Sequence, residues 1–306
     1  MRIVVAGGSG FLGRALVQAC RGDGHEVKVL TRRPRDADDV RWSPGAAASN
    51  TASGNWTTVL EHSHALVNLA GEGIADAQWT DSRKRAILES RVAATRALAG
   101  AIRACANPPR VFLSASGVGF YGTRGDETLT EESTPGADFL AAVCRVWEQE
   151  TSAAAGVARI VLLRTGLVLA RNGGALPRMA MPFRFFVGGR VGSGRQFMSW
   201  IHLADWVGMV RWALSNVDVA GPLNVTAPSP VTNAQFTAEL AGAMHRPALF
   251  PVPPFALRVL LGREMADSLL LGGQRALPAK AQRLGYRFSF SAVGPALRDV
   301  FVQPSS

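Results

Sequence analysis

The feature that most restricts the fold of this sequence is a glycine-rich turn close to its first residue. The β-branched run at residues 2–6 predicts a short strand, and the apolar spacing at residues 11–17 predicts a helix. Between them, Gly7-Gly8-Ser9-Gly10-Phe11-Leu12-Gly13 satisfies both Gly-x-Gly-x-x-Gly and Gly-x-x-Gly-x-x-Gly. A strand, a tight turn and a helix in this order indicate the start of a βαβ unit, and hence a parallel sheet.

This turn has the chemistry of a pyrophosphate site. Glycines allow positive φ and let a ligand approach the backbone, while the helix N-terminus offers unpaired N–H groups with partial positive charge. The sequence therefore predicts dinucleotide binding, and an ordinary tight turn is the alternative. The predicted cofactor-binding residues in this turn are Gly7, Gly10, Phe11, Leu12 and Gly13.

The end of the second strand bears on the choice of cofactor. An NAD site places Asp or Glu about twenty residues after the turn, to accept hydrogen bonds from the ribose hydroxyls. Here the strand at residues 26–30 ends in Thr31, Arg32 and Arg33. Guanidinium groups match a ribose 2′-phosphate, so NADP is favoured and NAD is less probable. The alternative is that one or both arginines simply face solvent.

Further strands and helices alternate along the first half of the chain. Strands are predicted at 65–70, 110–113 and 158–163, and helices at 80–105, with Thr80 as a cap, and at 138–155. The low-signal stretch at 35–58, including Ala46-Ala47-Ala48-Ser49, is expected to be weakly ordered in part.

The alternation of strands and helices predicts an α/β fold: a Rossmann doubly wound parallel sheet with a smaller C-terminal substrate lobe. After Gly166 the composition changes, which predicts a dinucleotide-binding domain at 1–166 and a lobe with a helical C-terminal segment at 167–306. A strand near 222–226 is expected to return to the main sheet.

Composition narrows the class of protein. The net charge of +10 comes almost entirely from Arg spread along the chain, since Lys occurs only at 28, 84 and 280, so nucleic-acid binding is not expected. Three cysteines without Cys-x-x-Cys spacing, and a His62-x-His64 pair without further ligands, predict neither disulfides nor a metal site. No apolar run approaches a bilayer span and no signal peptide is evident, so we expect a cytoplasmic protein that does not enter membranes. The oligomeric state is not indicated.

Taken together, the motifs resemble those of the extended short-chain dehydrogenase/reductases, and more narrowly the NAD(P)-dependent, epimerase-family proteins of the atypical branch. The resemblance runs along the whole chain, and its C-terminal part is similar to that family's small domain of unknown function. The motifs that carry it are Gly7 to Gly13, Val67-Asn68-Leu69-Ala70-Gly71, Arg91-Val92-Ala93-Ala94-Thr95, Ser114-Ala115-Ser116 with Tyr121-Gly122, Arg164-Thr165-Gly166, and Ser199 to Asp205.

The resemblance implies roles for several residues. Leu69, Ala70 and Gly71 would line the cofactor, and Arg164, Thr165 and Gly166 would lie near the nicotinamide. Ser116 would correspond to the catalytic serine that hydrogen-bonds the reacting oxygen, although a strand-end turn residue is the alternative.

One departure from the superfamily concerns its catalytic pair. The usual Tyr-x-x-x-Lys is missing, and Leu140 and Cys144 stand where its Tyr and Lys are expected. Tyr121 could supply a phenol near the nicotinamide, but without a nearby Lys its pKa should stay too high for an efficient base. Cys144 is either a nucleophile or proton carrier acidified by its surroundings, or a core residue on an apolar helix face.

Candidate substrate contacts lie outside the glycine turn. Glu72 follows the cofactor-lining run, where a carboxylate could meet substrate or simply face solvent. Arg195, in the glycine-rich stretch 188–196, could clamp a carboxylate or phosphate, with a surface hairpin as the alternative. His202, with Trp200, could form a pocket wall or belong to the core.

Two functions remain open from the sequence. The first is an NADP-dependent oxidoreductase or sugar-nucleotide epimerase, in which hydride passes between the nicotinamide and a small carbonyl or alcohol substrate beside Ser116. The second is a catalytically silent NADP-binding sensor or partner protein, which the missing Tyr-Lys pair favours.

Overall fold

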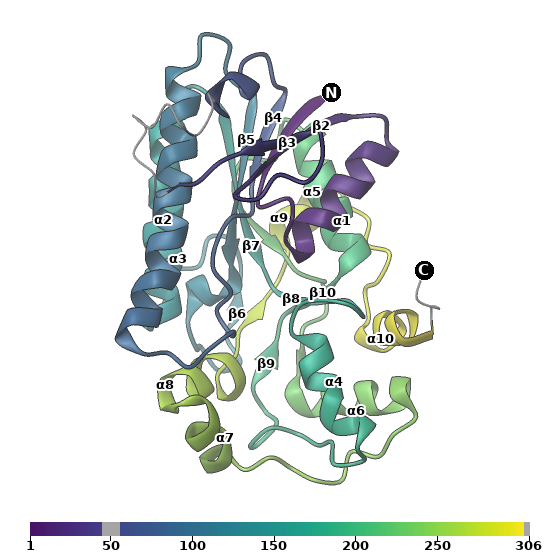
Figure 1. The fold of residues 1–306 in the computed structure, drawn as a ribbon. Coiled ribbons are helices and arrows are strands. Elements are labelled where there is room, and N and C mark those ends of the chain that lie inside the picture. The colour runs from purple at the N-terminus through teal and green to yellow at the C-terminus, as the bar shows by residue number, and fades with distance from the viewer. Residues whose placement is uncertain (45–55, 303–306) are drawn as a thin grey trace.

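The centre of the molecule is a seven-stranded parallel sheet with the order β11-β7-β5-β4-β1-β2-β3 (Figure 1). The computed structural model describes residues 1–44 and 56–302. The strands are β1 (Arg2–Ala6), β2 (Glu26–Thr31), β3 (Asp39–Arg41), β4 (Ala65–Asn68), β5 (Val111–Gly117), β7 (Arg159–Thr165) and β11 (Gly221–Val225). β11 is the returning strand that the sequence predicts, and it pairs with β7.

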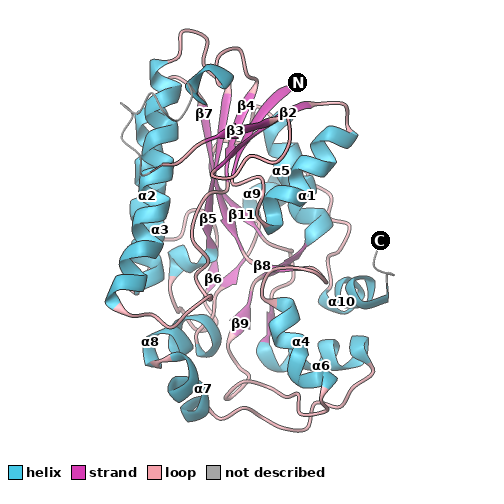
Figure 2. Cartoon of the chain, viewed as in Figure 1, coloured by secondary structure: helices cyan, strands magenta, loops and turns pink. Residues whose placement is uncertain are grey.

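Helices cover both faces of the sheet, as the doubly wound fold requires (Figures 1 and 2). On one face lie α1 (Phe11–Gly22) and α5 (Leu203–Ser215), which bury Leu16 and Trp206 against the strands. On the other lie α2 (Asp81–Ala104) and α3 (Phe139–Gln149). The predicted α/β class and Rossmann architecture are confirmed.

Local capping explains where two of these helices begin. The Thr80 side chain accepts a hydrogen bond from the Arg83 N–H at the start of α2, so the predicted cap is correct. Asp138 does the same for α3 through the Ala141 N–H. Helix α3 ends at Gln149 and continues as a 3-10 helix over Glu150–Ala154, so the helix predicted at 138–155 changes type in its last turn.

The stretch at 35–58, expected to be weakly ordered in part, contains a strand that the sequence did not indicate. Residues Asp39–Arg41 form β3, the edge strand, paired in parallel with β2. The following Trp42 is buried and its ring lies 5.8 Å from that of Trp56. Asp39-Val40-Arg41 is too short for its alternation to predict a strand, so pairing with β2 and the buried Trp42 indole decide it. The predicted Ala46 to Ser49 segment lies outside the described residues.

The rest of the chain forms a smaller part beside the carboxyl edge of the sheet (Figure 2). It includes the strand pairs β8–β10 and β9–β12, while β13 pairs with β6 from the first half of the chain. The strands are β6 (Thr128–Leu129), β8 (Leu167–Leu169), β9 (Phe197–Met198), β10 (Trp200–His202), β12 (Val231–Thr232) and β13 (Arg275–Ala276). The helices are α4 (Leu176–Arg184), α6 (Asn233–Met244), α7 (Pro254–Leu261), α8 (Arg263–Ala266) and α10 (Val293–Val302), whereas α9 (Ala279–Arg283) packs on the central sheet beside β11 and buries Ala281 in its core.

The chain crosses back to the central sheet after β8, through α5 and β11. The division at residue 166 therefore stays a proposal, with 203–225 returning to the first part. Among the described residues, no helix combines the length and apolar character needed to span a bilayer.

Candidate functional site

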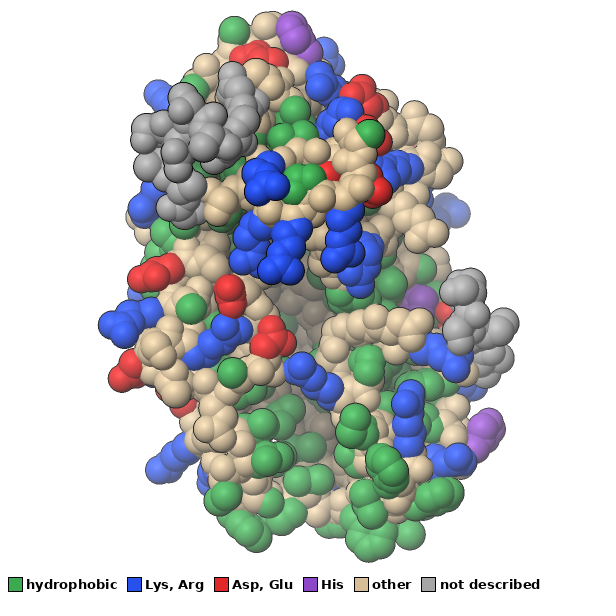
Figure 3. Space-filling model, viewed as in Figure 1, with side chains coloured by type: hydrophobic (Ala, Val, Ile, Leu, Met, Phe, Trp, Pro, Cys, Tyr) green, Lys and Arg blue, Asp and Glu red, His purple; other side chains and the backbone are tan. Residues whose placement is uncertain are grey.

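Most of the predicted site residues gather at one edge of the sheet, because all seven strands are parallel and their carboxyl ends meet there. The strand order reverses at β1, which has β4 on one side and β2 on the other. Ligands of open α/β sheets bind in the crevice at such a reversal. Figure 3 shows Lys and Arg side chains bordering a hollow near the centre of this face, between the central sheet and the part that holds α4 and α6.

The glycine turn lies at the end of β1 and leaves no room for a side chain at Gly7. Gly7 has φ 79°, and a Cβ there would lie 2.8 Å from the Leu69 carbonyl carbon at the end of β4. The Gly10 N–H donates to the Gly7 carbonyl at 3.0 Å, which tightens the turn. Gly10 is also the N-cap of α1 and offers no side chain to its first N–H groups. The amides of Phe11, Leu12 and Gly13 are thus free to meet a phosphate.

Phe11 shows how this turn is held against the smaller part. A Cβ on Gly174, in the loop after β8, would lie 3.2 Å from Cε1 of Phe11, so that loop passes directly over the ring. Leu12 packs on the core of the sheet. Both residues would therefore serve a cofactor through their backbone amides and not through their side chains.

The end of β2 carries two exposed guanidinium groups. Thr31 is buried, and its hydroxyl accepts a hydrogen bond from the Arg33 N–H at 3.3 Å. Arg32 and Arg33 are exposed, and within residues 1–44 and 56–302 neither side chain makes a hydrogen bond or ion pair. The turn and these free cations together fit a phosphorylated dinucleotide.

The run after β4 is fixed by a buried asparagine. Asn68 donates from Nδ2 to the Thr95 hydroxyl at 2.9 Å, and its Oδ1 accepts from the Ala70 N–H at 3.1 Å. These bonds hold Leu69 and Ala70 beside the Gly7 turn, where Gly7 approaches them most closely. The structure therefore brings this run and the glycine turn together at the crevice.

Ser116, at the end of β5, is engaged inside the protein. Its hydroxyl donates to a Glu148 carboxylate oxygen at 2.7 Å, and it is buried. Glu148 also receives two hydrogen bonds from Arg164, at 2.9 and 2.8 Å, and both side chains of this ion pair are buried. The guanidinium carbon of Arg164 lies 3.4 Å from the centre of the Phe120 ring. The donors of Arg164 are thus directed to protein groups, and its role toward the nicotinamide stays a prediction.

Tyr121 belongs to the same buried network. Its hydroxyl donates to Asn224 Oδ1 at 2.7 Å and accepts from Arg164 at 3.1 Å. Burial raises the pKa of Tyr121, and the nearby Arg164 cation only partly opposes that effect. A fully buried phenol with a raised pKa is a poor proton carrier at neutral pH. The structure therefore gives no support to Tyr121 as a catalytic base.

Cys144 and Leu140 face the end of β5 from α3. The Cys144 sulfur lies 3.8 Å from the Gly117 carbonyl oxygen, and a Cβ on Gly119 would lie 3.2 Å from Leu140 Cβ. Burial raises the pKa of the Cys144 thiol to about 11, so the thiol is protonated at neutral pH. This setting favours the core interpretation of Cys144 over the nucleophile.

Thr165 and Gly166 end β7 close to the core. The Thr165 hydroxyl accepts a hydrogen bond from the Trp206 indole at 3.2 Å, and the Gly166 N–H donates to Val225. A Cβ at Gly166 would lie 2.5 Å from the Ser199 carbonyl oxygen, so glycine is needed where β7 turns into β8. These contacts explain the motif by packing and leave its cofactor role a prediction.

The other predicted substrate contacts, Glu72, Arg195 and His202, do not form one cluster. Glu72 is paired with Arg83, with a carboxylate oxygen 2.7 Å from the guanidinium, and it lies next to the cofactor-lining run. Arg195 is exposed. His202 is buried, caps α5 by accepting from the Ala204 N–H, and lies 3.3 Å from Asp299. Burial lowers the pKa of His202. Its contacts are those of a structural residue.

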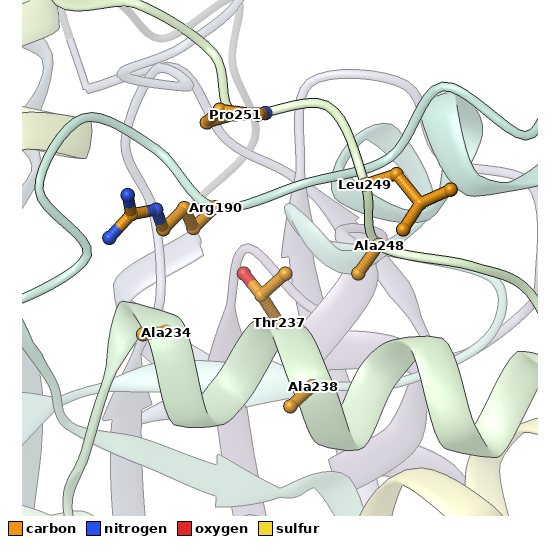
Figure 4. A pocket seen from close by; sticks show the side chains of 7 residues that line it. All are labelled: Arg190, Ala234, Thr237, Ala238, Ala248, Leu249 and Pro251. Carbon is orange, nitrogen blue, oxygen red and sulfur yellow. The ribbon is translucent and has the colours of Figure 1, made fainter.

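A second hollow lies in the smaller part, next to the glycine-rich stretch 188–196 (Figure 4). It has a volume of about 380 Å³, and Thr237 points from α6 into the space beneath Arg190 and Leu249. The guanidinium that lines it belongs to Arg190 and not to Arg195. Its walls are Arg190, Ala234, Thr237, Ala238, Ala248, Leu249 and Pro251.

Sequence reasoning missed a cation at the crevice. Arg91, on α2, lies against the run after β4, because a Cβ on Gly71 would be 3.3 Å from its guanidinium carbon. Arg91 donates to the Ile87 carbonyl at 3.0 Å and lies over the Trp147 ring at 5.0 Å. No carboxylate pairs with it among the described residues. Burial lowers the pKa of Arg91, while the nearby Cys144 and Glu72 oppose that effect. Arg91 was visible in the Arg-Val-Ala-Ala-Thr motif, but only the fold places it beside Cys144.

Comparison with known proteins identifies the family. Residues 3–226 match the model of the NAD dependent epimerase/dehydratase family, and residues 252–300 match a domain of unknown function, DUF1731. The chain belongs to the NAD dependent epimerase/dehydratase family. The resemblance to epimerase-family short-chain dehydrogenase/reductases, with the small C-terminal domain, is thereby confirmed, and a nicotinamide dinucleotide is the cofactor that this family and fold support.

Relatives and solved structures agree with this membership. The epimerase family protein YfhF of Bacillus subtilis is 41% identical over 306 residues, covering 97% of each chain. The crystal structure of human epimerase family protein SDR39U1 with NADPH is 35% identical, with a TM-score of 0.91 over 99% of this chain and 100% of the human one. A nucleoside-diphosphate sugar epimerase structure from Corynebacterium glutamicum is 34% identical, with a TM-score of 0.80 over 99% of this chain and 59% of that one. Structures under 25% identical share the fold, and several contain NAD.

Proposed function

We propose that this epimerase-family protein is an NADP-dependent oxidoreductase or sugar-nucleotide epimerase acting on a small carbonyl or alcohol substrate. The observation that carries the cofactor choice is the pair of guanidinium groups of Arg32 and Arg33, which have no partner in the described part of the chain and lie at the strand end next to the glycine turn. Because no acidic residue stands at that strand end, an NAD ribose would lack its usual acceptor. NADPH in the human SDR39U1 structure supports the same choice.

Different residues around the crevice would bind different parts of the cofactor. Amides of Phe11, Leu12 and Gly13 would bind the pyrophosphate, and Arg32 and Arg33 the ribose 2′-phosphate. Leu69, Ala70 and Gly71, fixed by Asn68, would line the site. When bound, the nicotinamide supplies hydride acceptance and donation.

Proton handling in this chain would differ from that of the superfamily. We propose that Arg91 replaces the missing Lys as the cation at the crevice. Arg91 lies beside Gly71, and its positive charge opposes the rise in the pKa of Cys144, the residue that stands where the Lys is expected. A guanidinium holds its proton, so Arg91 would stabilise negative charge on a reacting oxygen and would not donate the proton itself. The Ser116 hydroxyl donates its hydrogen bond to Glu148, and its oxygen can still accept one. Ser116 would therefore orient a substrate hydroxyl by accepting a hydrogen bond from it.

The cofactor proposal is tested by isothermal titration of both nucleotides. Arg32→Ala should weaken NADPH at least tenfold, as expected for a lost charged hydrogen bond, and leave NADH nearly unchanged. Because Arg32 is exposed and pairs with none of the described residues, the free energy of unfolding should change by less than about 0.5 kcal/mol. Equal losses for both nucleotides would show that the phosphorylated ribose lies elsewhere.

The catalytic part is tested by turnover over a panel of alcohols and nucleotide sugars. Arg91→Lys should keep part of the kcat that Arg91→Met loses, while both variants retain NADPH binding. Ser116→Ala should also lower kcat. Equal activity in Arg91→Met and the wild type would remove Arg91 from the mechanism.

The second candidate function is a catalytically silent NADP-binding sensor or partner protein. It is favoured by the burial of Tyr121, the high pKa of Cys144 and the internal hydrogen bond of Ser116, which leave few free groups for proton transfer. NADPH binding without turnover of any substrate in that panel would support it.

A further inference from the structure

A polar cavity lies at the opposite edge of the central sheet from the glycine turn. Its volume is about 520 Å³. It opens where β1, β4 and β5 begin, and since these strands are parallel, it is remote from their carboxyl ends. Its walls are Arg2, His62, Ser63, His64, Ala106, Asn107, Pro108 and Arg110.

The strand register brings three basic side chains into one row at this edge. Ile3 pairs with Ala65, and Ala65 pairs with Val111, so the preceding residues Arg2, His64 and Arg110 stand where three neighbouring strands begin. Backbone hydrogen bonds fix the row: the His64 N–H donates to the Arg2 carbonyl at 2.8 Å, and the Arg110 N–H donates to the His64 carbonyl at 3.0 Å. Arg2 is the first residue of β1, whereas His64 and Arg110 directly precede β4 and β5.

The acidic groups near this row leave one of its cations unpaired. Glu26 forms an ion pair with Arg2, with 3.4 Å between a carboxylate oxygen and Nε. The Glu61 carboxylate accepts hydrogen bonds from the Ala106 and Asn107 N–H groups at 2.9 and 2.8 Å, so it is directed at the backbone and not at Arg110. Arg110 is exposed and its side chain makes no hydrogen bond or ion pair among the described residues.

The two histidines add donors to the same cavity. Burial lowers the pKa of His64, and the further charges that lower it are all positive: Arg110, the N-terminal amine, Arg159 and His25. His62 has φ 58°, a conformation that residues with a side chain rarely adopt, and its N–H is held by the Asn107 carbonyl at 3.0 Å. Such outliers gather at binding sites.

We propose that this cavity binds a small phosphorylated ligand, a phosphate monoester, through Arg110, Arg2 and His64. Guanidinium forks and imidazole N–H groups are the side chains that bind phosphate oxygens well. The volume exceeds that of a bare phosphate and lies in the range of small-molecule sites, so the phosphate would carry a metabolite-sized body. This site is independent of the proposed NADP function, because it lies at the other edge of the sheet.

Inorganic phosphate is the probe, titrated calorimetrically into the full chain with and without excess NADPH. A site in this cavity should give saturable, millimolar binding of the same strength in both titrations, whereas phosphate bound at the glycine turn would be displaced by NADPH. Arg110→Gln should weaken it about tenfold or more, as for a lost charged hydrogen bond. Glycerol phosphate, a monoester, should bind at least as well.

The matched control is Arg145→Gln, which removes the same charge from an exposed position on α3 away from the cavity. It should leave phosphate binding unchanged. His62 and His64 ring proton resonances should shift on titration in the wild type, and in Arg110→Gln the same shift should need about tenfold more phosphate or more. Equal weakening in both variants would reveal a general charge effect, and absence of saturable binding to the wild type would overturn the proposal.

Discussion

The ends of β1 and β2 and the ends of β5 and β7 lie at the same edge of one sheet but are built on opposite principles. At the first pair, the polar groups are left open: the α1 amides have no side-chain cap, and Arg32 and Arg33 have no partner among the described residues. At the second pair, Ser116, Tyr121 and Arg164 satisfy one another and Glu148. Open groups are available to a ligand, whereas satisfied groups stabilise the fold.

The contrast bears on how motifs are interpreted. Both regions carry motifs of the same family, yet only the first keeps its donors free. The sequence shows that the Tyr-Lys pair is missing. It does not show that Ser116, Tyr121 and Arg164 join Glu148 in a closed buried network. Substitutions that remove one interaction from each region distinguish the two arrangements.

The largest effect is expected from Glu148→Ala. It leaves the buried Arg164 without its carboxylate, which should lower the free energy of unfolding by about 3–5 kcal/mol. The matched control is Glu150→Ala, two residues on, whose partner Arg96 is 67% exposed. That surface pair should contribute about 1 kcal/mol or less. Urea unfolding of both variants checks this, and similar losses would mean that the network is not closed.

Gly7→Ala tests the open region. The new Cβ meets the Leu69 carbonyl at 2.8 Å and the backbone holds φ 79°, so stability should fall by about 1–3 kcal/mol and NADPH binding should weaken at least tenfold. Gly100→Ala is the control, because nothing lies within 4 Å of its Cβ position on α2. It should stabilise the helix by about 0.5–1 kcal/mol. Thermal unfolding measures the stability of both variants, and titration measures their affinity for NADPH. Unchanged NADPH affinity in Gly7→Ala would show that the turn does not bind the cofactor.

Tyr121→Phe should separate a structural from a catalytic phenol. Removing the hydroxyl leaves Asn224 and an Arg164 donor without this partner, which should cost about 1–3 kcal/mol of stability. NADPH affinity should not change. A loss of turnover without any loss of stability would instead make Tyr121 catalytic.

The smallest effect concerns the thiols. Burial raises the pKa of Cys20, Cys105 and Cys144 to about 11 each, from 9.0 in the unfolded chain. Their contribution to stability is therefore fully present below about pH 9 and is lost as the pH rises through about 11. The native protein should react slowly with a disulfide reagent at pH 8, and all three thiols should react after unfolding. Rapid labelling of Cys144 in the native protein would support the nucleophile interpretation of this residue over the core interpretation.

Some elements were predictable because their signals are local. The glycine turn, the Thr80 cap and the strand at 26–30 each depend on residues adjacent in sequence, and each was found in place. The strand β3 was missed because its stability comes from pairing with β2 and from the burial of Trp42. Arg91 was missed as a site residue for a similar reason, since its closeness to Gly71 and Cys144 joins α2, β4 and α3.

By itself the sequence determined the βαβ start, the parallel class of the sheet, the position of two arginines after the second strand and the absence of the superfamily's Tyr-Lys pair. Backbone geometry and residue type suffice for these, because glycine at positive φ and a strand followed by a helix are short-range properties. Only the tertiary structure decided which polar groups remain available. Whether Ser116, Tyr121 or Cys144 can act depends on burial and on partners far away in sequence, such as Glu148 and Asn224, that no local pattern specifies.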